Sequence, residues 1–140
     1  MRRMEGALAM VQHPPGSGAF ARTLDARLAH EPTAERAQVT MRATEAHLNA
    51  NDILHGGVAM SLLDMAMATA VTQTLANGER AASIQIQTSF LKAAKLGDII
   101  ATGRVVRRGR TLAFAEGELS DAEGNVIARG NGIWAVSSKA

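Results

Sequence analysis

One apolar run restricts the folds open to this sequence more than any other feature. Within Gly57–Ala76 nearly every residue is apolar, over a length of about 20 residues that would suffice to cross a membrane. Asp64 and several hydroxyl side chains interrupt the run, and strand-like sequence follows it, so we expect a buried helix in a soluble protein. The dipeptide Asn77-Gly78 ends the run, as is typical of a helix C-terminus. The sequence therefore predicts one long helix that begins at Gly56 and, being hydrophobic nearly all round, is enclosed by the rest of the chain.

Strands are predicted on both sides of this helix. In the stretch that begins at Ser83, polar side chains at 83, 85, 87 and 89 share one face and largely apolar ones share the other, which is the period of a half-buried strand. Turn residues separate the later strands as hairpins. One apolar helix and one antiparallel sheet bury each other's hydrophobic faces, so we expect an α+β fold with one layer of each. The predicted strands are 26–30, 34–44, 83–91, 98–107, 111–120 and 126–136, and a short amphipathic piece covers 20–24.

Composition is consistent with one soluble domain. The chain has 140 residues, enough for its own core, and aromatic residues make up only 3%, so small aliphatic side chains build that core and oligomerisation is favoured. The absence of cysteine excludes disulfides and thiolate chemistry, and we expect a cytoplasmic location. A net charge of +2 gives little support for nucleic-acid binding. Residues 1–18 are expected to form a flexible N-terminal arm, neither secretory signal nor membrane segment, and residues 19–140 the domain.

Asp64 is the helix residue that a structural role explains least. Its neighbours are Met, Leu and Ala, and a buried, unpaired carboxylate costs several kcal/mol or has its pKa raised. A basic partner on a strand would make it structural; without one, it is a candidate catalytic group. At the helix start, Gly56 and Gly57 leave backbone N–H groups open to a ligand, and the helix dipole favours an oxygen that acquires negative charge there. This arrangement suits an oxyanion hole, although two glycines would equally serve a tight turn.

Gly56 and Asp64 are too far apart to act together within one chain. Their separation along the helix axis is about 12 Å, whereas an attacking group lies about 3 Å from a carbonyl carbon. If both groups serve one reaction, they therefore come from different chains. Two antiparallel helices in a symmetric pair would bring Gly56 of one chain beside Asp64 of the other. The sequence thus predicts composite sites, two in each dimer.

Three stretches of this sequence resemble a known family. They are HGGVAMSLLDMAMATA (55–70), SIQIQTSFLKAAKLGD (83–98) and RRGRTLAF (107–114), and their order and spacing resemble those of the hotdog-fold acyl-CoA thioesterases of the PaaI-like (phenylacetic acid degradation) family. The resemblance implies a long central helix wrapped by a curved antiparallel sheet, paired into homodimers with continuous sheets and often assembled further into tetramers; the sequence does not decide between dimer and tetramer. It also implies hydrolysis of acyl-CoA to a free carboxylic acid and CoA, with no metal and no cofactor.

The same resemblance implies roles for individual residues. Asp64 would be the nucleophile, or the general base that activates water, and the Gly56 N–H would polarise the thioester carbonyl. His55 and Asn49 would lie beside that carbonyl, where they would order the loop or contact the thioester. Ser83 would help to hold water near the carboxylate. Each of these lesser residues also has an ordinary structural explanation, as a helix-entry, loop or surface residue.

Further residues are candidates for substrate binding. Gly57 would allow the substrate to approach the helix start closely. One position departs from the family: glycine is common where this chain has Asp52, and the difference bears on the loop that carries Asn49. Arginines cluster at one predicted turn, and guanidinium groups suit phosphates, of which CoA carries several; a solvated turn is the alternative. The arginine candidates are Arg107, Arg108 and Arg110, with Arg104 close by in the sequence.

Two other functions remain open from the sequence. A non-hydrolytic acyl-CoA-binding module would share the fold, but it has no need of a costly buried acid. A hotdog dehydratase or hydratase would instead pair a catalytic histidine with an aspartate near the helix start. No set of histidine and acidic residues has the spacing of a metal site. The aliphatic residues of the helix suit medium-chain and aryl-acetyl groups alike, so the sequence does not name the acyl group.

Overall fold

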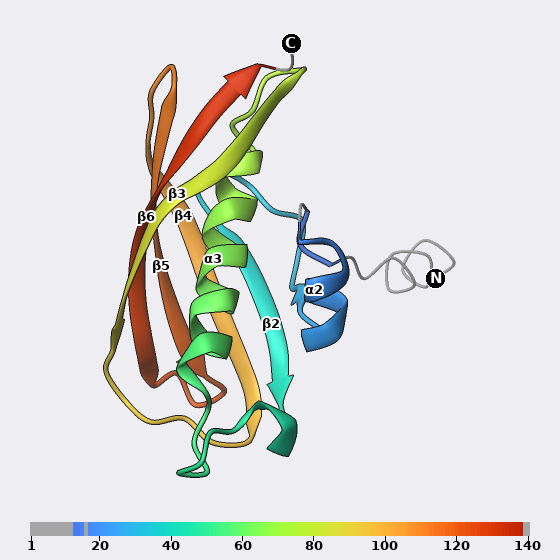
Figure 1. Cartoon of the computed structure of the whole chain (residues 1–140), viewed down its shortest axis with the longest axis vertical. Helices are drawn as coiled ribbons and strands as arrows, with labels where there is room; N and C mark the ends of the chain where they lie inside the picture. The colour runs from blue at the N-terminus through green and yellow to red at the C-terminus, as the bar shows by residue number, and fades with distance from the viewer. Residues whose placement is uncertain (1–12, 16, 139–140) are drawn as a thin grey trace.

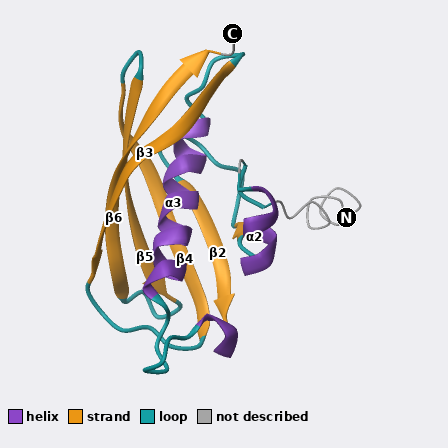
Figure 2. Cartoon of the chain, viewed as in Figure 1, coloured by secondary structure: helices purple, strands orange, loops and turns teal. Residues whose placement is uncertain are grey.

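The structure is a computed structural model, and it describes residues 13–15 and 17–138. Residues 1–12 of the predicted N-terminal arm, and the last two residues, lie outside the described part. One long helix and a six-stranded antiparallel sheet confirm the predicted α+β class (Figures 1 and 2). In chain order the elements are α2 (Gly18–Leu24), β1 (Arg27–Leu28), β2 (Ala37–Ala43), the 3-10 helix η1 (Glu45–His47), α3 (Gly56–Thr72), β3 (Glu79–Phe90), β4 (Gly97–Arg108), β5 (Leu112–Asp121) and β6 (Val126–Ser138).

The sheet curves around α3, which lies along its inner side (Figure 1). Its strand order is β1-β2-β4-β5-β6-β3, so the two-residue β1 forms one edge and the twelve-residue β3 the other. Leu62, Leu63 and Met67 of α3 are fully buried in a core shared with Trp134 of β6 and Ile99 of β4. Burying a side chain of this size stabilises the fold by roughly 1.5–3 kcal/mol, so packing against the sheet holds α3 in place.

A row of glycines explains how closely α3 approaches the sheet. Gly103 is the register partner of Gly117, and Gly117 is that of Gly130, so the three lie side by side on β4, β5 and β6. A Cβ at Gly103 would lie 2.5 Å from the backbone carbonyl of Ala66, and one at Gly117 would lie 3.2 Å from Leu63. Because these three positions have no side chains, α3 packs closely against the backbone of β4, β5 and β6.

The helix is shorter than the sequence predicts. It begins at Gly56 as expected, but it ends at Thr72 and not at Ala76. The hydroxyl groups of Thr72 and Thr74 donate to helix carbonyls four and three residues earlier, and the amides of the last turn also bond three residues back. Such bonds tighten a helix end and compete with its continuation. Gly78, with a φ of 84°, then turns the chain into β3 earlier than predicted.

β3 does not alternate along its whole length as predicted. Its register against β6 shifts between Ser83 and Gln85, which marks a β-bulge with one extra residue. Ser83 consequently faces α3, where its hydroxyl meets Asp64, whereas Gln87 and Ser89 line the outer face of the sheet. The prediction that these four polar positions share one face is therefore wrong, because the bulge moves the alternation by one residue.

One strip of α3 lies outside the cover of the sheet. Gly57 and Met60 are exposed, and Asp64, one turn further along the same face, is only partly buried. The sequence predicts a helix enclosed by the rest of the chain, but the described residues leave this strip of α3 uncovered. The reason is that a sheet covers only one side of a helix that packs on it. Neither α2 nor α3 has the length and apolar character needed to cross a membrane, and these are the α-helices of the described chain.

Candidate active site

The start of α3 is held by a histidine cap. His55 precedes the helix in an extended conformation, and its Nδ1 accepts a hydrogen bond from the Gly57 N–H at 2.8 Å. A neutral imidazole with Nδ1 as acceptor carries its proton on Nε2. A Cβ at position 57 would lie 3.0 Å from Nδ1, so glycine there gives the ring room to fold over the helix end. The Gly57 N–H therefore already has a hydrogen-bond acceptor in His55. The predicted role of Gly57 in substrate binding stays a prediction.

The Gly56 N–H is the amide left open at this helix end. It has no hydrogen-bond acceptor among residues 13–15 and 17–138. Gly56 lines a cavity of about 350 Å³, together with Asn49, Phe90 and Lys92. The ring of Phe90 packs on the glycine, at 3.2 Å from the place of a Cβ. A free N–H at the positive end of a helix dipole, in a cavity beside an aromatic ring, can stabilise an oxyanion.

The loop before α3 is braced by Asn49. Its side-chain oxygen accepts hydrogen bonds from the backbone N–H groups of Asn51 at 2.9 Å and Ile53 at 3.4 Å. Asp52 has a φ of 58°, the left-handed conformation that glycine adopts most readily and aspartate tolerates. The departure from the family at this position thus leaves the loop in the backbone conformation that a glycine would favour. Asn49 supports the loop that leads to Gly56.

Asp64 lies two turns further along α3, partly buried and without a cationic partner. Among the described residues, no arginine, lysine or histidine nitrogen lies within 4.0 Å of its carboxylate. Ser83 Oγ of β3 donates to its Oδ1 at 3.3 Å. Burial raises the pKa of Asp64, and the weaker effect of the Ser83 hydrogen bond lowers it. A carboxylate with a raised pKa and no counter-ion is a stronger base than an exposed one.

A second cavity, also of about 350 Å³, opens at Asp64. It lies between α2, α3, β3 and β6, and the described part of its lining includes neither Gly56 nor Asn49. Its described lining residues are Pro15, Ser17, Phe20, Asp64, Met65, Ala68, Thr72, Ala81, Ala82, Ser83 and Trp134. The structure therefore brings Asp64 together with Ser83, and Gly56 together with Asn49, but places the two pairs in different cavities. This agrees with the separation of about 12 Å expected from the helical rise.

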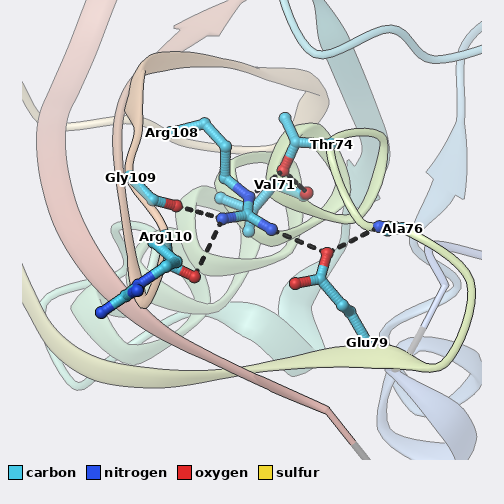
Figure 3. A network of polar contacts seen from close by, with 7 residues as sticks. All are labelled: Val71, Thr74, Ala76, Glu79, Arg108, Gly109 and Arg110. Atoms are coloured by element: carbon cyan, nitrogen blue, oxygen red, sulfur yellow. Dashed lines mark hydrogen bonds and ion pairs between the residues drawn. The ribbon is translucent and has the colours of Figure 1, made fainter.

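The predicted arginine cluster lies at the turn between β4 and β5, and its members differ. Arg107 and Arg110 are exposed. The guanidinium of Arg108 instead contacts Glu79 at 2.8 Å and Thr74 at 3.2 Å (Figure 3). The pKa of Glu79 is held below its ordinary value, chiefly by the hydrogen bond that it accepts from the Ala76 N–H and to a lesser extent by the hydrogen bond and charge of Arg108. Arg108 thus ties the turn to the end of α3, and phosphate binding by the three arginines stays a prediction.

Sequence reasoning missed three aromatic residues of these cavities. Phe90 packs on Gly56, and Phe20 and Trp134 line the Asp64 cavity. The chain has only three phenylalanines, one tryptophan and no tyrosine, so most of its aromatic side chains gather at the two cavities. That scarcity was a usable signal, although positions so far apart in sequence gave no indication that they meet. Within residues 13–15 and 17–138, no group of three potential metal ligands lies together.

Residues 51–128 match the family model described as Thioesterase superfamily. The matched segment carries the helix start at Gly56, the Asp64 carboxylate and Ser83, and it makes up more than half of the chain. The chain belongs to the thioesterase superfamily, with a hotdog fold of the PaaI-like type, as the resemblance implied. The family assignment therefore agrees with the fold and with the chemistry of the Gly56 and Asp64 cavities.

Individual relatives refine this assignment. Acyl-coenzyme A thioesterase 13 of Homo sapiens is 37% identical over 92 residues, which span 64% of this chain and 65% of that protein, less than two thirds of its length. A putative thioesterase of Ralstonia eutropha JMP134, described as phenylacetic acid degradation-related, is 30% identical with a TM-score of 0.78, over 84% of this chain and 89% of that one. A Bacillus halodurans protein whose structure was solved with CoA is 25% identical with a TM-score of 0.69, over 71% and 66%.

Proposed function

We propose that this protein hydrolyses acyl-CoA thioesters at composite sites formed by two copies of the chain. The observation that carries the proposal is that the two groups expected to act together lie in two separate cavities of one chain. The Gly56 amide opens into one cavity and the Asp64 carboxylate into another, on a single continuous helix. Neither cavity holds both an oxyanion donor and a base among the described residues. A second copy of the chain would supply to each cavity what it lacks.

The free edge of the sheet supports such pairing. β3 is an edge strand of twelve residues with its Ile84 side chain 57% exposed, and long exposed edges readily pair with another strand. Antiparallel pairing of β3 with its copy would continue the sheet across a two-fold axis and set the two α3 helices antiparallel. Gly56 of one protomer would then lie beside Asp64 of its partner. The exposed strip of α3 around Met60 would be covered by the same contact.

In this site Asp64 acts as a general base. Ser83 occupies Oδ1, so Oδ2 takes a proton from a water molecule, and the resulting hydroxide attacks the thioester carbonyl carbon. Negative charge on the carbonyl oxygen is stabilised by the N–H of the partner's Gly56. The C–S bond breaks, CoA leaves as a thiolate, and Asp64 returns the proton to it. In isotopically labelled water, a single turnover should leave the label in the product acid; label in the Asp64 carboxylate would indicate direct nucleophilic attack instead.

Arg107 and Arg110 are the proposed contacts for the CoA phosphates. Both are exposed at the turn between β4 and β5, whereas the ion pair of Arg108 with Glu79 holds that turn in place. Replacing both exposed arginines by alanine should raise KM several-fold for CoA esters, but not for pantetheine esters, which lack the nucleotide phosphates. Arg104→Ala is the control, because this arginine is paired with Glu116. An equal rise in KM for both kinds of ester would contradict phosphate binding.

The composite site is tested with two variants that each lack one of the two proposed groups and should each be nearly inactive. Asp64→Asn removes the base. Gly56→Pro removes the N–H and keeps the helical backbone: proline is well tolerated at the first position of a helix, and His55 already has the extended conformation that a following proline requires. A purified heterodimer of the two variants contains one intact site, so it should have about half the thiol-release activity of the wild-type dimer.

Two comparisons complete this experiment. Gly56→Ala retains the N–H while adding a similar contact with Phe90, so it should retain most of the activity that Gly56→Pro loses. An inactive heterodimer made from two folded variants would mean that the residues do not act across protomers. Release of no CoA by the wild type, over a panel of acyl-CoA substrates, would disprove the hydrolase and favour a binding module.

A further inference from the structure

We infer that Phe20, on the short helix α2, determines which acyl groups the site accepts. This inference rests on the proposed function, because it assigns the Asp64 cavity to the acyl part of the thioester. Phe20 lies far from Asp64 in sequence and before the segment 51–128 that matches the family, yet both residues line the same cavity. Phe20 therefore lies outside the residues that carry the family match.

The chemistry of the two cavities decides the direction in which a substrate lies. The described lining of the Asp64 cavity contains no arginine or lysine, and its large side chains are Phe20, Met65 and Trp134. The Gly56 cavity, by contrast, includes Lys92. The Gly56 cavity is otherwise lined mainly by apolar residues, so its Lys92 cation is what assigns the anionic CoA to that side and leaves the Asp64 cavity for the acyl group. With the thioester carbon at the Asp64 carboxylate, the acyl group extends into the Asp64 cavity.

The course of the acyl group follows from residues at regular helical spacing. Asp64, Ala68 and Thr72 all line the cavity and lie one turn apart on the same face of α3. The cavity thus runs along the helix for about 12 Å beyond the carboxylate. Its volume of about 350 Å³ is at the low end for ligand sites, which extend to about 1,000 Å³. This size suits an acyl group of medium length and is too small for a fully enclosed long chain.

α2 holds Phe20 firmly at the wall of this cavity. Ala21 and Leu24 of the same helix are buried in the core, so the helix is anchored through the face next to Phe20. The residues that flank α2 are also held together, because a ring nitrogen of His13, before the helix, lies 2.6 Å from the carbonyl oxygen of Ala26, after it. Phe20 itself remains 53% exposed, a large apolar side chain that is positioned but not covered. A bound acyl group would cover it.

Trp134 forms a second part of the wall. Its indole nitrogen is fully buried, and the ring therefore presents carbon atoms to the cavity. Because Trp134 is buried in the core, a change there would disturb the fold as well as the cavity. Phe20 offers the cleaner test, since its large exposed fraction means that little folding energy depends on it.

The experiment compares kcat/KM for butanoyl-, octanoyl- and palmitoyl-CoA in three variants. Phe20→Ala opens the wall, and we expect the ratio of palmitoyl to octanoyl kcat/KM to rise at least about tenfold, because one methylene in an apolar pocket already changes discrimination by that much. Phe20→Trp narrows the cavity and should shift the preference towards butanoyl-CoA. Arg22→Ala, at an exposed position of α2 that does not line the cavity, should leave the profile unchanged.

The outcomes separate the two proposals. An unchanged acyl profile in Phe20→Ala and Phe20→Trp, with hydrolysis intact, would overturn the role of Phe20 and leave the hydrolase standing. An equal shift of the profile in Arg22→Ala would also overturn it, because the effect would then come from disturbing α2. If the wild type hydrolyses none of the three substrates, the proposed function fails and this inference fails with it. Thermal unfolding of each variant confirms that the folded proteins are being compared.

Discussion

The two ends of the candidate site lie on one helix but are built from different chemistry. At the start of α3, the proposed oxyanion donor is a backbone N–H, held in place by the His55 cap and by the Asn49 hydrogen bonds in the preceding loop. Two turns later it is the Asp64 carboxylate, whose pKa is raised by burial. A peptide amide does not titrate at ordinary pH, whereas a carboxylate does. Changes at the first place should therefore alter the rate, and changes at the second should alter its pH dependence as well.

The largest effect is expected for Asp64→Asn. Loss of the proposed general base should lower kcat by about 10²–10⁴-fold while acyl-CoA binding is retained. Thiol release measures the first and calorimetric titration with a non-hydrolysable thioether analogue the second. Nearly full turnover in the variant would disprove the mechanism.

The same variant should be more stable than the wild type near neutral pH. Because the pKa of Asp64 is raised above 3.8 in the folded state, ionisation destabilises that state, increasingly as the pH rises from 3.8 through the folded pKa. Asparagine carries no charge, so the gain in the urea midpoint should be largest near neutrality and should shrink in acid. A wild-type protein that is more stable than the variant at neutral pH would indicate a charged partner for Asp64.

A smaller effect is expected at the other end of the comparison, from Asn49→Ala. The substitution removes the acceptor that braces the loop before Gly56, so the oxyanion donor moves and kcat should fall about tenfold, less than the 10²–10³-fold that follows outright loss of such a donor. The acid limb of the pH–rate profile should not move. Asn51→Ala is the matched control, since it leaves the backbone N–H of that residue in place; an equal loss there would mean that the loop is only generally sensitive.

Ser83→Ala should have the smallest effect on rate and the clearest effect on pH dependence. The Ser83 hydroxyl lowers the pKa of Asp64, so its removal raises that pKa further. Since the ionised carboxylate is the active form in the proposed mechanism, the acid limb of kcat/KM should shift to higher pH, with only a few-fold loss on the plateau. Ser89→Ala, on the outer face of β3, serves as the control. An unmoved limb in Ser83→Ala would show that this hydroxyl does not interact with the working carboxylate.

Most of the fold was predictable because it depends on local patterns. The helix start at Gly56 and all six strands follow from apolar periodicity and turn residues, and these signals survive because each element buries the face that its own sequence makes apolar. The helix end was wrong by four residues, because hydroxyl side chains at Thr72 and Thr74 bond to the preceding turn. Periodicity does not register such side-chain bonds, since they depend on rotamers and not on hydrophobicity.

The catalytic candidates divide in the same way. Asp64 stands out from sequence alone because an acid without a partner is costly among apolar residues, and its distance from Gly56 is set by helical geometry. The bulge that turns Ser83 towards Asp64, and the packing that brings Phe20 to the same cavity, are properties of the assembled chain. They arise when strands pair and helices pack, which places residues far apart in sequence within contact distance. Local pattern thus indicated the candidate groups, and long-range packing determined what surrounds them.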